Sequence, residues 1–169
     1  SNGKPNSNGL FIYDSDNNFI ANNLVKSHDF GIAIYYTGTN TLQNNTMIDN
    51  DYNFYVDGDA PSEFVQYVDP PNTVDGKPIY YLVNALDIIL DAKTKAGFVA
   101  VVNSANVTVR DLVFTKNGPG MLFSNVTNSL IENVTTFGNY QAGIKLLFST
   151  YTTVLGNILN GGATVSGTS

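Results

Sequence analysis

"GLFIYDSDNNFIANN", residues 9–23, and "GIAIYYTGTNTLQNN", residues 31–45, are two versions of one pattern placed 22 residues apart. In both, a glycine opens an apolar run, and an apolar residue stands two positions before an asparagine. Glycine-led apolar runs recur at Gly97, Gly120 and Gly143, after further intervals of 66, 23 and 23 residues. Because 66 is three times 22, a single period of about 22 residues organises the chain.

A repeat of this length predicts stacked β-strands. The unit is too short for a helical hairpin and lacks the 3.6-residue spacing of an amphipathic helix, and the regular leucines of a leucine-rich repeat are absent. At about 3.3 Å per residue, one unit circles a triangular coil of three short strands, and each coil stacks about 4.8 Å above the last. One coil cannot bury its own apolar face, so the fold requires the repetition. We therefore predict an all-β, right-handed, single-stranded parallel β-helix of about five or six coils, with residues 1–169 as one domain.

Residues 53–96 break this period for 44 residues. The prolines of this part of the chain are Pro61, Pro70, Pro71 and Pro78. Proline cannot donate to a strand ladder, so four regular central strands are not expected here. We predict an irregular coil that begins at "NFYV", residues 53–56, and carries an inserted lobe around residues 57–96.

One position of the repeat predicts a side-chain ladder. In these repeats, an apolar residue is followed two places later by an asparagine or aspartate, and these residues are Asn22, Asn44, Asp111, Asn133 and Asn157. An asparagine amide both donates and accepts hydrogen bonds, and asparagine tolerates left-handed turn geometry. We expect this set to stack along one inner corner of the coils.

The composition excludes several classes of partner. The net charge is −6, without a Lys/Arg cluster, so we expect no nucleic-acid partner. No apolar run approaches the ~20 residues of a membrane span, so we expect none. The chain has no cysteine, which removes disulfides and thiolate metal sites but leaves the compartment open. It begins "SNGKPNSNG" without Met, and we expect it to be part of a longer protein.

The stretches "NNFIANNLV", "NTLQNNTMI", "NVTVRDLVF" and "NSLIENVTTF" resemble the repeats of the NosD-like, or CASH (carbohydrate-binding and sugar-hydrolase), group of right-handed parallel β-helices. "NTVDGKPIYYLVN", residues 72–84, resembles the interrupting segment of archaeal surface members of that group. The resemblance covers the chain from Gly9 to about Asn160. It implies the fold but not one activity, because the group includes structural surface proteins, glycan-active enzymes and a periplasmic accessory protein of copper-enzyme maturation.

An enzyme of that group would require acidic and basic residues at its active site. Such enzymes cleave acidic polysaccharides with a Ca²⁺-binding carboxylate cluster and a basic residue, or hydrolyse them with a carboxylate pair. Asp49, Asp51, Asp57 and Asp59 are candidate Ca²⁺ ligands at one corner, although Asp-Gly runs are also ordinary turn material. We assign no catalytic residue, since no acidic residue and basic residue occupy matching positions of the repeat.

Aromatic residues give a second candidate site. Tyr13 and Tyr35 share one repeat position, and Tyr36 lies beside them, so a β-helix would stack them on its outer surface. Exposed tyrosines can pack against the apolar faces of sugars. The alternative is that the lobe carrying "PIYYLVNALDIIL", residues 78–90, or a second copy of the chain in a homodimer covers them.

This cover is expected because the strands are apolar at both parities, so residues such as Phe11, Val99 and Leu122 form an outward stripe. Taken together, we expect a structural or binding module of a secreted or cell-surface protein, extracellular or periplasmic, that binds a glycan or polysaccharide and is not catalytic by itself. The alternative is a polysaccharide lyase or glycoside hydrolase. A copper-delivery role would require clusters of His, Met or Cys, and the chain has one His and two Met.

Overall fold

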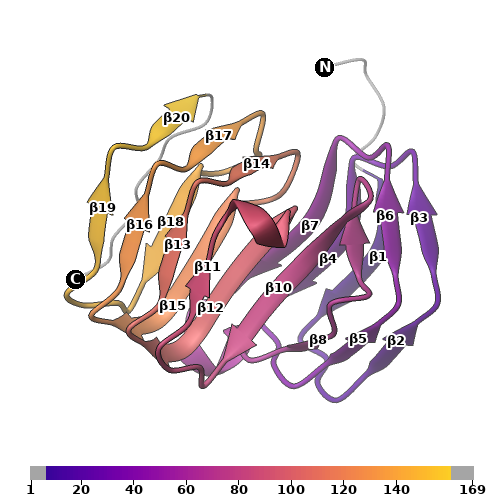
Figure 1. Cartoon of the computed structure of the whole chain (residues 1–169). Helices are drawn as coiled ribbons and strands as arrows, with labels where there is room; N and C mark the ends of the chain where they lie inside the picture. The colour runs from indigo at the N-terminus through magenta and orange to yellow at the C-terminus, as the bar shows by residue number, and fades with distance from the viewer. Residues whose placement is uncertain (1–6, 161–169) are drawn as a thin grey trace.

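The computed structural model describes residues 7–160 and shows a parallel β-solenoid of seven coils (Figure 1). The first strands of the coils are β1 (Asn8–Tyr13), β4 (Phe30–Tyr35), β7 (Tyr52–Asp57), β10 (Lys77–Val83), β12 (Phe98–Ala105), β15 (Met121–Thr127) and β18 (Ile144–Leu147). The second strands are β2 (Phe19–Ala21), β5 (Thr41–Gln43), β8 (Tyr67–Val68), β11 (Ile89–Leu90), β13 (Thr108–Arg110), β16 (Leu130–Glu132) and β19 (Thr153–Leu155). The third strands are β3 (Leu24–Lys26), β6 (Thr46–Ile48), β9 (Thr73–Val74), β14 (Val113–Thr115), β17 (Thr135–Phe137) and β20 (Ile158–Asn160). The predicted parallel β-helix is confirmed, with seven coils instead of the five or six expected.

The coils form two stacks, which are joined by a hairpin. The first stack contains β1–β9 and the second contains β10–β20, seen at the right and left of Figure 1. β9 and β10 pair antiparallel through Asp75 and Gly76, whose φ values are 47° and 76°. Two consecutive positive φ angles in an Asp-Gly pair are those of a type I′ turn. As a result, one sheet with the order β18-β15-β12-β10-β9-β6-β3 runs through both stacks.

The two faces of this shared sheet belong to different cores. Ala100, Val102 and Leu122 pack with Phe54 in the core of the first stack. Val99 and its neighbours of opposite parity pack in the core of the second stack. Side chains alternate between the two faces of a strand, so apolar residues at both parities are what this arrangement requires.

The irregular segment is divided between the two stacks. A one-turn 3₁₀ helix, η1 (Pro61–Phe64), lengthens the third coil, where ladder partners lie 26 and 27 residues apart instead of 22. Phe64 is fully buried in the first core. Residues 78–90, expected as a lobe, form most of β10 together with β11 and so begin the second stack. A second 3₁₀ helix, η2 (Ala92–Thr94), stands where the other coils have their third strand.

The predicted cover is present over only part of the outward stripe. Leu122 is fully buried because the first core packs over it. Val99 is also buried, but it points into the second core rather than outward. Phe11 and Tyr13 remain 54% and 56% exposed. The first stack therefore keeps an open aromatic surface, and a homodimer through it stays a prediction.

The asparagines form two ladders, one exposed and one buried. Asn44 donates to Asn22 at 2.8 Å on the exposed side of the corner, and both residues have positive φ. The buried ladder is formed by the residue that follows. Asn45 accepts from the backbone and side-chain nitrogens of Asn23 and donates to Asn72 at 2.9 Å.

The same division holds in the second stack. Asn133 and Asp111 are exposed and 3.5 Å apart, whereas Asn157 accepts from the backbone of Val134 and donates to that of Ile131. Of the predicted inner ladder, only Asn157 therefore faces inward; the other four residues lie on the exposed side.

Candidate functional site

The side chains on the outer face of the sheet β1-β4-β7 form two rows that run across the strands. One row is Phe11, Ala33 and Tyr55, and the other is Tyr13, Tyr35 and Asp57. Tyr36 follows in the turn after β4. We call the surface formed by Phe11, Tyr13, Tyr35 and Tyr36 the aromatic face; Tyr55 lies beneath it and is only 2% exposed.

The rings of the aromatic face are in mutual contact. Ring centroids are 5.4 Å apart for Phe11 and Tyr35, 5.7 Å for Tyr13 and Tyr36, and 4.8 Å for Tyr35 and Tyr55. The structure thus brings together the three tyrosines selected from the sequence. Phe11 was expected on the outward stripe but was not selected as a sugar-binding residue, and the structure adds it to this site.

Tyr36 is held in an unusual backbone conformation. Its φ is 52°, in the left-handed region that bulky residues rarely adopt. The backbone nitrogen donates to the carbonyl of Asp57 at 3.0 Å, which fixes the turn to the next coil. Tyr36 is 39% exposed and lies at the edge of the aromatic face.

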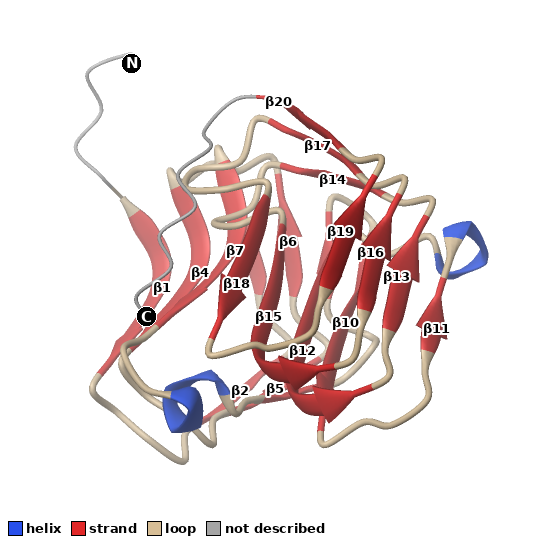
Figure 2. Ribbon diagram, turned by 90° about the vertical axis from the view of Figure 1, so that its left-hand side faces the viewer, coloured by secondary structure: helices blue, strands red, loops and turns tan. Residues whose placement is uncertain are grey.

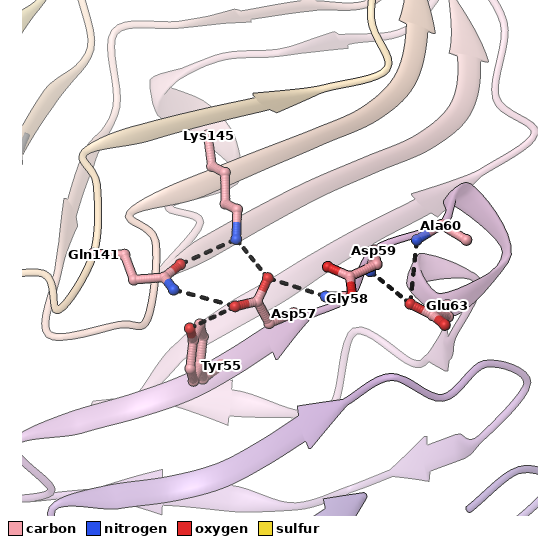
Figure 3. Close-up of polar contacts among 8 residues, drawn as sticks. All are labelled: Tyr55, Asp57, Gly58, Asp59, Ala60, Glu63, Gln141 and Lys145. Carbon is pink, nitrogen blue, oxygen red and sulfur yellow. Dashed lines mark hydrogen bonds and ion pairs between the residues drawn. The ribbon is translucent and has the colours of Figure 1, made fainter. Parts of the chain in front are cut away.

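The ribbons of β7 and β18 lie side by side (Figure 2), and a polar cluster that borders the aromatic face joins them (Figure 3). The Nζ of Lys145 lies 2.6 Å from Oδ1 of Asp57. Oδ2 of the same carboxylate accepts from the Tyr55 hydroxyl at 2.8 Å and from Gln141 at 3.1 Å. Lys145 and Gln141 come from the second stack, more than 80 residues along the chain, so no local pattern could have revealed them.

The surroundings fix the charge states of these groups. Burial alone would raise the pKa of Asp57, but the hydrogen bond and positive charge of Lys145 outweigh it and lower the pKa. Burial raises the pKa of Tyr35 to about 12 and raises that of Tyr55 further, with the Asp57 carboxylate adding to the latter. At neutral pH the carboxylate is therefore ionised and both phenols keep their protons, so neither tyrosine is a base.

A second aromatic group continues from Tyr55 toward the second stack. Phe30 lies 5.7 Å from Tyr55 and 4.9 Å from Tyr140, measured between ring centroids. A depression of about 370 Å³ opens beside Tyr52, between β7 and the loops that contain Lys116 and Gly138. The aromatic rings thus extend across the junction between the stacks.

The proposed Ca²⁺ ligands are not brought together. Asp49 and Asp51 precede β7, whereas Asp57 and Asp59 lie at its far end, and a six-residue strand spans about 20 Å. Between residues 7 and 160, no group of three or more His, Cys, Asp or Glu side chains is arranged to hold a metal ion. Among the described residues, no helix is both long and apolar enough to cross a membrane.

Comparison with known proteins identifies one family. Residues 2–78 and 72–168 each match the family model described as "Periplasmic copper-binding protein (NosD)". The two matches overlap at residues 72–78, around the Asp75–Gly76 hairpin, so each corresponds mainly to one stack. No curated protein and no solved structure matches the chain.

Proposed function

Since this chain belongs to the NosD family, we propose that it is a β-solenoid module that binds a sugar chain on its aromatic face and catalyses no reaction by itself. The family is described as periplasmic copper-binding proteins. On that description, we propose that the module acts outside the cytoplasm, in the periplasm or at the cell surface.

The exposure of the aromatic face is the observation that supports this proposal. Tyrosine combines a flat apolar ring with a hydroxyl that donates and accepts hydrogen bonds. Sugar rings present the same combination, with apolar C–H faces and polar rims. Phe11 and Tyr13 are each more than half exposed, and they contact the rings of Tyr35 and Tyr36. The result is a surface several rings wide, in which neighbouring rings are tilted by 57° and 76°, and this width suits an oligosaccharide better than a single sugar.

Copper binding does not fit the residues of this chain. Copper sites in proteins use imidazole, thioether and thiolate ligands in clusters. The sequence has no cysteine and a single histidine, His28. Met47 and Met121 are fully buried, and they lie in different cores. We therefore propose no copper chemistry for this chain.

The alternative function, a lyase or hydrolase, requires an acid and a base that converge on a groove. At the aromatic face, the lysine and the carboxylate that approach each other are Lys145 and Asp57, which neutralise one another. Arg110, the single arginine, lies on β13 and pairs with Glu132 at 3.8 Å. These pairings favour a binding module over a lyase or hydrolase.

The test is calorimetric titration of the protein with a panel of oligosaccharides of equal length. Tyr13→Ala should weaken binding about tenfold, because a stacking ring is lost. Tyr67→Ala is the matched control, since Tyr67 is 54% exposed on a different sheet. Equal affinities for the two variants would contradict the proposal, as would a panel in which nothing binds.

A further inference from the structure

We propose that the aromatic face selects amino-sugar chains, which carry positive charge, and excludes polyuronates. This inference rests on the proposed function and adds the chemical class of the ligand. It follows from the charges that surround the exposed rings.

The strands and turns that form the aromatic face are acidic. Residues 8–16, 30–38 and 52–63 contain no lysine, arginine or histidine. Their acidic residues are Asp14, Asp16, Asp57, Asp59 and Glu63. In the described part of the chain, the cation that forms an ion pair with one of these carboxylates is Lys145 of β18, and its partner is Asp57. Five carboxylates against one ammonium leave a local charge of 5 − 1 = 4 negative units.

Several of these carboxylates are fixed in place by hydrogen bonds. Oδ1 of Asp16 accepts from the Thr37 hydroxyl at 2.7 Å and from the Gly38 backbone at 2.9 Å. Glu63 accepts from the backbone of Asp59 at 2.6 Å (Figure 3). The negative charge is therefore held beside the rings.

These carboxylates also act on the phenol of Tyr36. Its pKa is raised, first by the charge of Asp59, with smaller contributions from burial and from Asp57. A negative potential at an exposed ring attracts cations that stack on it and repels anions.

Hydrogen-bond direction favours the same ligand. An ionised carboxylate accepts hydrogen bonds and cannot donate them. Asp59 is exposed, and in the described structure its side chain is engaged in no hydrogen bond or ion pair. An ammonium group brings three donors, whereas a uronate brings more acceptors and a like charge. The site therefore combines attraction of amino sugars with rejection of uronates.

The experiment compares three oligosaccharides of equal length: glucosamine, N-acetylglucosamine and galacturonate. Titrations are run in mildly acidic buffer, where the amines are protonated, at low and at raised salt. We expect the glucosamine chain to bind about tenfold more tightly than its acetylated counterpart at low salt, and the galacturonate chain not to bind. Raised salt should reduce the difference, because exposed charges are screened beyond a Debye length of about 8 Å at physiological ionic strength.

Asp59→Asn is the informative variant. It removes one exposed charge and should reduce the preference for glucosamine over N-acetylglucosamine severalfold. Asp69→Asn is the matched control, since Asp69 is an exposed aspartate that follows β8 at another corner, and it should leave the preference unchanged.

The possible results separate the two proposals. Equal, Tyr13-dependent binding of the glucosamine and acetylated chains would overturn the charge selection and leave sugar binding intact. Binding of galacturonate, or a preference that Asp59→Asn does not change, would overturn it as well. If no sugar binds, both proposals fail.

Discussion

At the residue scale, the adjacent asparagines Asn44 and Asn45 have different structural roles. Asn44 takes the left-handed turn position, with φ of 53°, and its side chain lies at the surface. Asn45 points inward, where its amide donates to the carbonyl of Ile20 and to Asn72. A buried amide without partners costs free energy, whereas an exposed one is satisfied by water. Asn45 should therefore contribute more to the free energy of unfolding than Asn44.

We predict that Asn45→Ala lowers the free energy of unfolding by about 1–3 kcal/mol, because it leaves the buried Asn72 side chain and the partly buried backbone groups of Asn23 and Ile20 without this partner. Asn44→Gly should change it by less than about 1 kcal/mol, since glycine adopts positive φ readily. Urea denaturation of both variants measures the difference. Comparable losses from the two substitutions would mean that the exposed ladder is as important as the buried one.

The sequence could predict the ladder but not its register. The first two coils each offer two neighbouring asparagines, and the period alone does not say which one turns and which one faces inward. The last coil holds the missing clue. Gly156 there has a φ of 64° and occupies the turn position, which places Asn157 inward. A glycine at that slot is the sign that the preceding asparagines serve as turn residues.

At the element scale, β7 connects the core, the aromatic face and the second stack. Phe54 and Val56 point into the first core, while Tyr55 and Asp57 point outward. The backbone of Phe54 accepts from Gly118 at 2.8 Å, which joins the strand to the second stack. The Asp57–Lys145 pair ties the end of the same strand to β18.

We predict that Gly118→Ala destabilises the junction by about 1–3 kcal/mol through overpacking. A Cβ at this position would lie 2.0 Å from Cδ2 of Tyr55, so the tyrosine ring must move. Gly138→Ala is a useful comparison: its Cβ would meet nothing within 4 Å, but its φ of 64° carries strain. Thermal unfolding measures stability, and sugar titration should show weakened binding for Gly118→Ala but not for Gly138→Ala. Unchanged binding in Gly118→Ala would show that the buried ring of Tyr55 does not position Tyr35 for binding.

We predict that Lys145→Met costs about 1–3 kcal/mol at neutral pH, since the two side chains are 13% and 21% exposed and the loss leaves a partly buried carboxylate unpaired. Arg110→Met, which breaks a pair whose arginine is 42% exposed, should cost about 0–1 kcal/mol. Denaturant titrations of the two variants give the comparison. Equal costs would show that the junction pair contributes no more than a surface pair.

The pair also sets a pH dependence. The folded-state pKa of Asp57 is lowered, so its contribution is complete above the unfolded-state value of about 3.9 and is lost as the pH falls through the folded-state value. We expect the stability difference between the native protein and Asp57→Asn to be constant above about pH 5 and to disappear in strong acid. A difference that persists in acid would mean that Asp57 stabilises the junction by packing rather than by charge.

At the scale of the whole molecule, two solenoid stacks share one sheet and enclose two cores. The 22-residue period was sufficient to predict the coils and to group Tyr13 with Tyr35, because stacking converts spacing in the sequence into contact in space. It could not predict the meeting of Asp57 with Lys145, which depends on how the stacks join. The sequence "VDGK", residues 74–77, does contain the Asp-Gly signal of a hairpin, but the surrounding prolines favoured a lobe instead.

The most direct test of the account is an amide NMR titration of the whole chain with the oligosaccharide that binds most tightly. We predict that the resonances of β1, β4 and the turn at Tyr36 shift progressively and saturate, while those of β11, β13 and β16 on the opposite sheet stay in place. Shifts confined to β11, β13 and β16, or no shifts at a saturating sugar concentration, would contradict the assignment of the aromatic face as the binding site.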